Sequence, residues 1–458
     1  MFFSIQIYVD KESASDFFIT LMLFIDVKSK IIFLMHSLPL FFYTLFCPFI
    51  MGAAKLLSPL HPKLRTFFQV RQRVFEELEK KIAPIPSSAV RVWIHAASVG
   101  EFEQARPIIA ALKKKRPDIT FFVSFLSDSG YNARKNFTDA SAVFYLPIDT
   151  QTNAKKLVSL LKPDVLLLMR YDFWPNHLLE AKKYGTKLIL AAAVLQKNAP
   201  YFKPVVKNFY RSIFHLFDKI YTVSSNDTLA FRKTFFCQQT ETAGDPRFDQ
   251  VFIRSKNTAG VDHIKPFFDH KTVLVAGSVW EKDIDLLLTA WQKLKKRPSL
   301  ILVPHEVHPE KMANLYRDLQ NRSFGFVKVS SMDRTFTPDS EILVIDQTGY
   351  LVELYSIASM AYVGGGFGVN VHNTLEPGIY GIPVVFGPNY HNSPEAEGLV
   401  AAGGAMVIHD EATLTAALQT LITNATERNR RGKTAETFVK ERTGATTKIA
   451  DSIMSLLK

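Results

Sequence analysis

A serine, a glycine and a glutamate stand close together in the segment His95-Ala-Ala-Ser-Val-Gly-Glu101. The apolar run before it predicts a buried strand, so Ser98 lies at the strand's end and Glu101 begins the next helix. Gly100 permits close approach to the backbone. A carboxylate in this place can accept a proton from an attacking hydroxyl if its pKa suits the task. The spacing Ser98-x-x-Glu101 also fits a capping box, so helix capping is the alternative.

A second group of polar side chains follows an apolar segment that ends at Met169. Arg170, Asp172 and Trp174 fall in the loop after this predicted strand, where α/β enzymes place ligand contacts. A Trp-Pro turn packed beneath the site is equally compatible with the pattern. Arg247 is a further candidate for the acceptor side or the cleft, near the junction of two domains.

Three consecutive glycines, Gly364, Gly365 and Gly366, follow a short apolar run. They allow a sharp turn and let the backbone approach a ligand with no Cβ in the way. Asn373 then begins a predicted helix, whose free N–H groups favour an anion such as phosphate. The order of strand, glycine loop, helix and strand is typical of nucleotide-binding α/β folds. Asn373 and Glu376 also fit a capping box, so ligand binding and capping both stay open.

Two other segments of the C-terminal half are candidates for binding a phosphate or a metal ion. Ser278 lies in a small-residue turn before a predicted helix N-terminus, which suits a phosphate. His305 and His308 follow another predicted strand, and two histidines three residues apart can bind a metal ion. No third ligand has a convincing spacing, so we expect no metal site.

Alternating strand and helix patterns position these candidates. Helix-length segments separate the apolar runs, which predicts mostly parallel sheets in two α/β domains with a ligand cleft between their carboxyl ends. The predicted strands are residues 90–97, 119–127, 142–148, 164–169, 186–195, 219–225, 272–278, 299–304, 324–329, 341–346, 360–366, 382–387 and 405–408. The predicted boundaries are an extension of uncertain status (1–34), a membrane anchor (35–60), a Rossmann-like domain (61–250), a linker (251–265), a second Rossmann-like domain (266–430) and a C-terminal helix (431–458).

Composition narrows the class of protein. The chain has 458 residues, too many for a single core, and 47% of them are hydrophobic. Its net charge of +12 predicts an anionic partner: nucleic acid, an acidic membrane surface or a phosphorylated substrate. Two cysteines, Cys47 and Cys237, form no metal-binding or disulfide pattern, which favours a reducing, cytoplasmic setting.

The N-terminal region contains an apolar segment. Residues 31–54 include no Asp, Glu, Lys or Arg, and roughly 20 apolar residues suffice to span a bilayer. Basic residues follow, which favours a cytoplasmic location for the remainder. We interpret the segment as a spanning or interfacial membrane anchor, with a buried core helix as the alternative.

The motifs in combination resemble a known family, the 3-deoxy-D-manno-octulosonic acid (Kdo) transferases of lipopolysaccharide biosynthesis. The resemblance covers roughly residues 38–458. The matching motifs, in the family's order, are IHAASVGE, LPID, the Trp-Pro-Asn loop, AGDPRFD, the Gly-Ser turn, VPHEVHPEK and YVGGGF…HNTLEP…G.PVVFGP.

This resemblance implies a GT-B glycosyltransferase that moves Kdo from CMP-Kdo to the glucosamine disaccharide of the lipid A precursor (lipid IVA). It implies Glu101 as the catalytic base of an inverting single displacement, and a nucleotide site at Asn373 and Glu376, with Glu376 on the ribose hydroxyls. The expected location is the cytoplasmic face of the inner membrane, with no cofactor and no nucleic acid partner. The donor-binding candidates are Ser278, His305, Gly364, Gly365, Gly366, Asn373 and Glu376.

Three places depart from the family pattern. Arg170 and Asp172 replace two glutamates, Pro304-His305-Glu306 replaces Pro-Arg-His, and Asn370-Val371-His372-Asn373 replaces Gly-Gly-His-Asn. They affect the contacts expected with acceptor and phosphate. The alternatives are a UDP-sugar transferase or a nucleotide-sugar epimerase of the same fold, because fold alone does not set the donor, and a membrane-tethered binding protein without catalysis.

Overall fold

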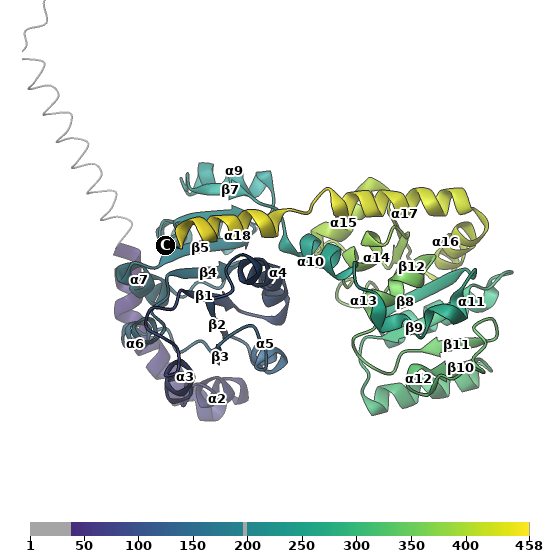
Figure 1. Cartoon of the computed structure of the whole chain (residues 1–458), viewed down its shortest axis with the longest axis horizontal. Helices are drawn as coiled ribbons and strands as arrows, with labels where there is room; N and C mark the ends of the chain where they lie inside the picture. Colours follow the sequence, from purple (N-terminus) through teal and green to yellow (C-terminus); the bar gives the residue numbers. More distant parts are fainter. Residues whose placement is uncertain (1–37, 196–198, 458) are drawn as a thin grey trace, which may run out of the picture. The chain divides into compact units, whose positions relative to one another are not determined.

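The computed structural model describes residues 38–195 and 199–457, which form two compact units (Figure 1). The first unit contains the described residues up to Gly244 together with residues 446–457. The second unit contains Asp245–Ala445. The predicted extension, residues 1–34, lies outside the described residues. Both units alternate strands and helices along the chain, as the apolar patterns predict.

The first unit has a seven-stranded parallel sheet in the order β3-β2-β1-β4-β5-β6-β7. The chain builds this sheet outward from β1 to β3 and then returns to place β4 on the other side of β1. Open α/β sheets bind ligands at such a switch point, beyond the carboxyl ends of the strands. The strands are β1 (Arg91–Ala96), β2 (Thr120–Phe125), β3 (Ala142–Tyr145), β4 (Val165–Met169), β5 (Lys187–Ala193), β6 (Lys219–Thr222) and β7 (Thr240–Thr242).

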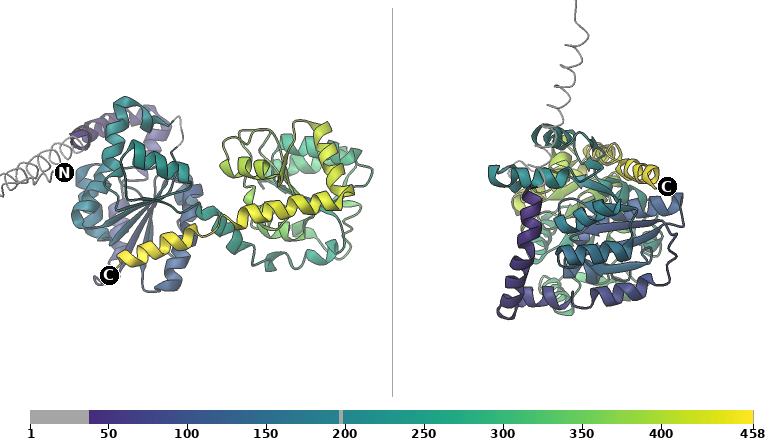
Figure 2. Two further views of the ribbon diagram at one scale, coloured as in Figure 1. Left: turned by 90° about the horizontal axis from the view of Figure 1, so that it is seen from above. Right: turned by 90° about the vertical axis from the view of Figure 1, so that its left-hand side faces the viewer.

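Both faces of this sheet are covered. Along β1, Val92 and Ile94 enter one apolar layer and Trp93 enters the other, as the alternation of a strand requires. The C-terminal helix α18 (Ala445–Leu456) packs on the layer of Val92 through Ile449 (Figure 2). The other helices of the unit are α2 (Pro62–Gln69), α3 (Val74–Ile82), α4 (Val99–Lys115), α5 (Asp128–Arg134), α6 (Gln151–Leu161), α7 (Pro175–Tyr184), α8 (Pro204–Phe214) and α9 (Ser225–Thr234).

An apolar helix over residues 38–57 precedes these elements and continues into a 3-10 turn, Ser58–Leu60. In the right-hand view of Figure 2 this helix, in dark purple, runs along one side of the first unit. The stretch Leu38–Leu60 is long and apolar enough to cross a membrane by length and composition. Only 11% of its most apolar window is buried. The structure therefore contains one helix at the place of the predicted anchor.

The second unit has its own seven-stranded parallel sheet, in the order β10-β11-β9-β8-β12-β13-β14. Its switch point lies between β8 and β12. The strands are β8 (Val273–Val279), β9 (Ser299–Pro304), β10 (Gly325–Lys328), β11 (Glu341–Val344), β12 (Met360–Val363), β13 (Val384–Phe386) and β14 (Ala405–Val407). The helices are α10 (Pro246–Arg254), α11 (Glu281–Lys293), α12 (Pro309–Asn321), α13 (Leu351–Leu354), α14 (Leu375–Ile379), α15 (Pro394–Ala402), α16 (Glu411–Thr423) and α17 (Ala425–Lys440).

Two features differ from the sequence expectations. Strand β7 was not predicted, because Thr-Glu-Thr lacks an apolar pattern. The segment 251–265, expected to be a linker, begins inside α10 and then packs on the second sheet. Val261 and Ile264 are fully buried there, although their neighbours in the sequence are polar.

Candidate active site

A hydrogen-bonded group of side chains lies at the carboxyl ends of β1 and β4. His95 Nε2 lies 2.8 Å from Asp172 Oδ2, and His95 Nδ1 lies 2.8 Å from Ser124 Oγ. The Trp93 indole N–H donates to the same Ser124 hydroxyl at 2.8 Å. Because that hydroxyl accepts from Trp93, its own hydrogen can go to His95 Nδ1, and Nε2–H then donates to Asp172. The His95 ring therefore holds the carboxylate of Asp172, one of the predicted site residues, in a fixed position.

Glu101 takes part in the cap of α4 with only one carboxylate oxygen. Ser98 is the N-cap and its Oγ accepts the Glu101 N–H at 3.4 Å, while Glu101 Oε2 accepts the Ala97 N–H at 2.6 Å. Within the described part of the chain the carboxylate accepts no other hydrogen bond. Gly100 is exposed, and a Cβ there would meet only Ser98 Oγ, at 4.0 Å. Glu101 Oε1 and the space beside Gly100 are therefore available to a ligand.

The surroundings of Glu101 favour its protonated form relative to a free glutamate. Burial is the largest cause and raises the pKa of the Glu101 carboxyl. The Ala97 N–H opposes this, Asp172 raises the pKa further, and His95 and Arg170 lower it. The net effect is a raised pKa, which is the direction expected of a carboxylate that accepts a proton during a reaction near neutral pH.

Arg170 and Trp174 lie at the two ends of the loop between β4 and α7. Arg170 adopts a left-handed backbone conformation with φ of 60°, and its Nε donates to Gln104 Oε1 of α4 at 2.8 Å. Such a conformation costs a non-glycine residue about 1–2 kcal/mol and is concentrated at functional sites. Trp174 is the N-cap of α7, and its indole N–H is buried without a hydrogen-bond partner among the described residues.

Arg247 lies in the second unit, on α10, and two carboxylates hold it. Its guanidinium donates to Asp245 Oδ2 from Nε and Nη2 at 2.9 and 2.8 Å, and to both Glu395 oxygens at 2.8 and 3.2 Å. Burial alone would lower the pKa of Arg247, but the charges of Asp245 and Glu395 raise it above its ordinary value. Asp245 and Glu395 already bind N–H groups of Arg247, so contact between Arg247 and the sugar acceptor stays a prediction.

At the switch point of the second unit, Asp283 connects three elements. This buried carboxylate accepts hydrogen bonds from the backbone N–H of Trp280 at 3.0 Å, the Tyr362 hydroxyl at 2.8 Å and the backbone N–H of Gly365 at 2.9 Å. Beside it, Ser278 has a left-handed φ of 54°. The N-terminus of α11 already has the Asp283 anion next to it, which differs from the open phosphate site that the sequence suggested there.

The glycine loop is required by the packing of the protein itself. A Cβ on Gly364 would lie 2.3 Å from Ser278 O, and one on Gly366 would lie 2.6 Å from Gly387 N. Gly365 has φ of 92°, which disfavours any other residue. These positions therefore need glycine for close approach between backbone segments. The expectation that they leave open space for a ligand does not describe Gly364 and Gly366.

Three rings meet beside this loop. The Trp280 indole N–H lies 2.8 Å from His372 Nε2, and these two rings are inclined by only 20°. The His305 ring stacks on both, with centroids 4.3 Å from Trp280 and 4.3 Å from His372. Burial and His305 lower the pKa of His372, while Asp283 opposes them. A neutral His372 can accept the indole N–H, so Trp280 and His372 form a flat platform with the His305 ring stacked on one face.

Asn373 and Glu376 lie at the start of a short helix, which begins two residues after Asn373. Helix α14 covers only Leu375–Ile379, and the exposed Asn373 accepts the Leu375 N–H through Oδ1 at 3.1 Å. Glu376 is half-buried, and its charge adds to the effect of burial in raising the pKa of Tyr355. The structure places Glu376 near a buried phenol and leaves its role in ligand binding as a prediction.

Sequence reasoning missed several members of these sites. His305 was a predicted donor-binding residue, but Trp280 and His372 were not. The three residues belong to separate loops, and no spacing rule indicates that their rings meet. His95 was part of the quoted motif, but its link to Asp172 depends on the neighbouring positions of β1 and β4. Asp283 had a local signal, because an acidic residue in the first turn of a predicted helix is typical of a cap.

Comparisons with known proteins identify a family to which the chain is similar. A family model described as "3-Deoxy-D-manno-octulosonic-acid transferase (kdotransferase)" matches residues 68–250. The 3-deoxy-D-manno-octulosonic acid transferase of Haemophilus influenzae is 23% identical over 432 residues, which cover 91% of this chain and 99% of the relative. The Aquifex aeolicus transferase of the same name is 29% identical, over 72% of this chain and 86% of its own.

These matches identify the chain as a homologue of the Kdo transferase family. This is a family of glycosyltransferases of lipopolysaccharide biosynthesis. Solved structures show the same GT-B type of fold. A glycosyltransferase from Rickettsia africae has a TM-score of 0.54 at 13% identity and covers 81% of this chain and 99% of its own. A UDP-GlcNAc 2-epimerase from Neisseria meningitidis also has a TM-score of 0.54, at 17% identity, covering 80% of this chain and 100% of its own.

Proposed function

We propose that this Kdo transferase uses CMP-Kdo as donor and the glucosamine disaccharide of a lipid A precursor, lipid IVA, as acceptor. The observation that carries the proposal is the environment of Glu101. Its carboxylate sits at a switch point with one oxygen bound to the Ala97 N–H, and its pKa is raised. A general base needs this combination of fixed position, free oxygen and raised basicity.

In the proposed step, an acceptor hydroxyl oxygen attacks the anomeric carbon of Kdo. The bond between that carbon and the phosphate oxygen breaks, and CMP leaves with the electron pair. The hydroxyl proton passes to Glu101 Oε1. One base and a stabilised leaving group suffice for such a single displacement, which inverts the configuration at the anomeric carbon.

The second unit is proposed to bind the donor. The platform of Trp280 and His372, with His305 stacked on one face, offers a flat surface on which a nucleobase can stack. Asp283 positions this platform by holding the Trp280 backbone, and the same carboxylate holds the Gly365 N–H. One buried carboxylate thus sets both the aromatic and the glycine-loop parts of the proposed site.

The remaining donor contacts are assigned by their chemistry. Ser278 and the loop of Gly364, Gly365 and Gly366 are proposed to lie beside the phosphate. The Gly364 and Gly365 N–H groups already bind the Gly277 carbonyl and Asp283, so the Ser278 hydroxyl and the Gly366 N–H are the proposed donors. Glu376 is proposed to accept hydrogen bonds from the ribose hydroxyls. Asn373 is proposed to act beside Glu376, since its exposed side chain precedes the same short helix.

The first unit is proposed to bind the acceptor around Glu101. Ser98 and Gly100 form the N-terminal turn of α4 beside the base. Asp172 and Arg170 are held by His95 and by Gln104, respectively. Trp174 closes the same loop at the N-terminus of α7. These fixed polar groups can orient a sugar hydroxyl toward Glu101.

The apolar helix of residues 38–57 is proposed to hold the protein at the cytoplasmic face of the inner membrane. A helix with one apolar exposed face can lie at a membrane surface, and a net charge of +12 favours an anionic one. The exposed apolar side chains along this stretch are Leu38, Phe41, Phe42, Leu45, Phe46, Phe49, Ile50, Leu56 and Leu57.

The test is incubation of the full-length protein in detergent with CMP-Kdo and a lipid A precursor. We expect release of free CMP and an increase in acceptor mass by one or more Kdo units. Parallel reactions with UDP-GlcNAc address the alternatives of the same fold. Conversion of UDP-GlcNAc without turnover of CMP-Kdo would overturn the proposal in favour of an epimerase or a UDP-sugar transferase.

A further inference from the structure

The apolar helix has a second face that binds the first unit. Leu40, Tyr43, Thr44 and Cys47 are buried or half-buried, and their spacing of three and four residues places them on one side of the helix. Tyr43 also packs on Phe209 of α8, with ring centroids 5.7 Å apart. The helix is therefore attached to the unit by a defined face, opposite its exposed apolar residues.

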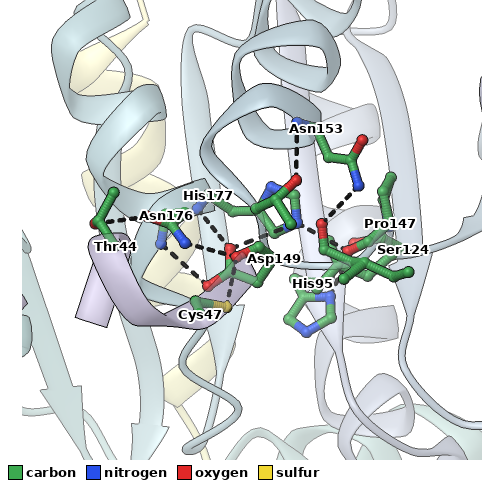
Figure 3. Close-up of polar contacts among 12 residues, drawn as sticks. Thr44, Cys47, His95, Ser124, Pro147, Asp149, Asn153, Asn176 and His177 are labelled. Carbon is green, nitrogen blue, oxygen red and sulfur yellow. Dashed lines mark hydrogen bonds and ion pairs between the residues drawn. The ribbon is translucent and has the colours of Figure 1, made fainter. Parts of the chain in front are cut away.

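Three polar groups of this inner face converge on Asp149 and Asn176. Figure 3 shows two of them, Thr44 and Cys47, beside these residues. The Tyr43 hydroxyl donates to Asp149 Oδ2 at 2.9 Å, and the Cys47 thiol donates to the Asp149 carbonyl at 3.1 Å. The Thr44 hydroxyl donates to Asn176 Oδ1 at 2.7 Å, and Asn176 Nδ2 donates to the Asp149 carbonyl at 2.5 Å. We call Tyr43, Thr44, Cys47, Asp149 and Asn176 the docking junction.

Asp149 also caps helix α7 from outside that helix. Its carboxylate accepts the N–H groups of Asn176 at 3.1 Å and His177 at 2.9 Å, in the first turn of α7. The N-cap residue itself, Trp174, provides no side-chain cap. A carboxylate at a helix N-terminus satisfies free N–H groups and interacts favourably with the helix dipole. The start of α7 thus depends on a residue that the apolar helix holds.

The loop directly before α7 carries Asp172, which binds His95 beside Glu101. A second route runs through the core: the buried His177 ring packs edge-to-face on Trp93, with centroids 6.3 Å apart, and Trp93 donates to Ser124 next to His95. A displacement at the N-terminus of α7 would therefore reach the surroundings of Glu101 over a short chain of direct contacts.

We propose that the docking junction makes the apolar helix a positioning element of the acceptor site, with Asp149 as its central positioning residue. The helix then has two tasks on opposite faces: contact with the membrane, and alignment of α7 with the loop that carries Asp172. This inference rests on the proposed function in one respect: the rate of Kdo transfer is the quantity that reports whether α7 and its loop are correctly aligned.

The experiment compares Tyr43→Phe/Thr44→Val with Thr186→Val in the full-length protein. Each threonine change removes one hydroxyl bond of similar length, Thr44 to Asn176 at 2.7 Å and Thr186 to the Pro163 carbonyl at 2.8 Å. Thr186 follows the opposite end of α7, away from the candidate site, so it controls for lost stability. The readouts are melting temperature, kcat for a detergent-dispersed acceptor, and KM for CMP-Kdo.

We expect the Tyr43→Phe/Thr44→Val pair to lower kcat about tenfold, since small misplacements of reacting groups carry large kinetic costs. Donor KM should stay within about twofold of the original, because the donor contacts are proposed on the other unit. Thr44→Ser, which restores a hydroxyl, should recover much of the rate when combined with Tyr43→Phe. Thr186→Val should lower the melting temperature with kcat unchanged.

Equal kcat in Tyr43→Phe/Thr44→Val and Thr186→Val would overturn the inference, as would a rise in donor KM without loss of kcat. If the pair fails to fold, the single variant Thr44→Val replaces it against the same control. Absence of Kdo transfer by the unaltered protein would instead contradict the proposed function, so the two failures are distinguishable.

Discussion

The carboxyl ends of the two sheets carry different kinds of side chain. At the first, ionisable groups surround Glu101: Asp172, His95 and Arg170 all act on its pKa. At the second, three aromatic rings and a glycine loop surround a single buried carboxylate, Asp283. The first arrangement suits proton transfer and the second suits recognition of a flat, weakly charged group.

This contrast predicts that mutations at the first site impair catalysis and that mutations at the second impair nucleotide binding. A change at the first site should remove the chemical step while leaving nucleotide affinity intact. A change at the second should weaken nucleotide binding while leaving the base functional. Glycine also has a different role at each site. A Cβ on Gly100 would have open space around it, whereas a Cβ on Gly364 would collide with backbone atoms.

The largest expected effect is that of Glu101→Gln, which removes the base and keeps the shape of the side chain. Turnover should fall by about 10²–10⁴-fold, the usual contribution of a general base. CMP affinity, measured by calorimetry on the same preparation, should not change. Near-normal turnover would reduce Glu101 to a cap of α4.

Glu376→Ala should have the next largest effect. If the carboxylate accepts ribose hydroxyls, CMP and CMP-Kdo should both bind more weakly by a shared factor of about 10–100, from a charged hydrogen bond of about 1.5–3 kcal/mol. Binding isotherms for the two ligands check this. A lowered melting temperature with unchanged CMP affinity would show that Glu376 serves the fold of α14 only.

Alanine at the two kinds of glycine should give opposite results. Gly364→Ala places a Cβ 2.3 Å from Ser278 O and should destabilise the second unit by about 1–3 kcal/mol, as overpacking does. Gly100→Ala meets nothing closer than 4.0 Å and should leave stability within about 0.5 kcal/mol, with a higher acceptor KM. Denaturant unfolding and steady-state kinetics measure both. Equal loss of stability in the two variants would contradict the difference between the sites.

The smallest expected effect is a shift of pH dependence in Asp172→Asn. Glu101 acts as a base only when ionised, so activity is lost as pH falls through its raised pKa. Asp172 contributes to that rise, whereas His95 and Arg170 oppose it. Removing the Asp172 charge should lower the pKa of Glu101 and move the acid limb of kcat to lower pH. A shift to higher pH, or none, would disagree with this arrangement of charges.

The sequence predicted most of the fold because strands buried on both faces form continuous apolar runs, as in residues 164–169. Prediction failed where burial depends on distant partners. Thr240–Thr242 joins the sheet edge without an apolar pattern. Val261 and Ile264 are isolated apolar residues in a polar segment, and their burial follows from packing against the second sheet.

The same difference between local patterns and contacts among distant residues applies to the candidate sites. Ser98, Gly100 and Glu101 form one turn, so a local pattern is enough to predict that they lie together. Trp280 and His372 are 92 residues apart, and their hydrogen bond depends on the order of β8, β9 and β12 in the sheet. Asp149 likewise acquires its role only when two helices meet at its carboxylate.

The central claim is direct displacement by an acceptor hydroxyl that Glu101 deprotonates. The most direct measurement is the anomeric configuration of the transferred Kdo, determined by NMR on the isolated lipid product and compared with that of CMP-Kdo. The account predicts inversion, because one displacement occurs at the anomeric carbon. Retention of the donor configuration would contradict it, since retention requires a second displacement and a nucleophile in place of a base.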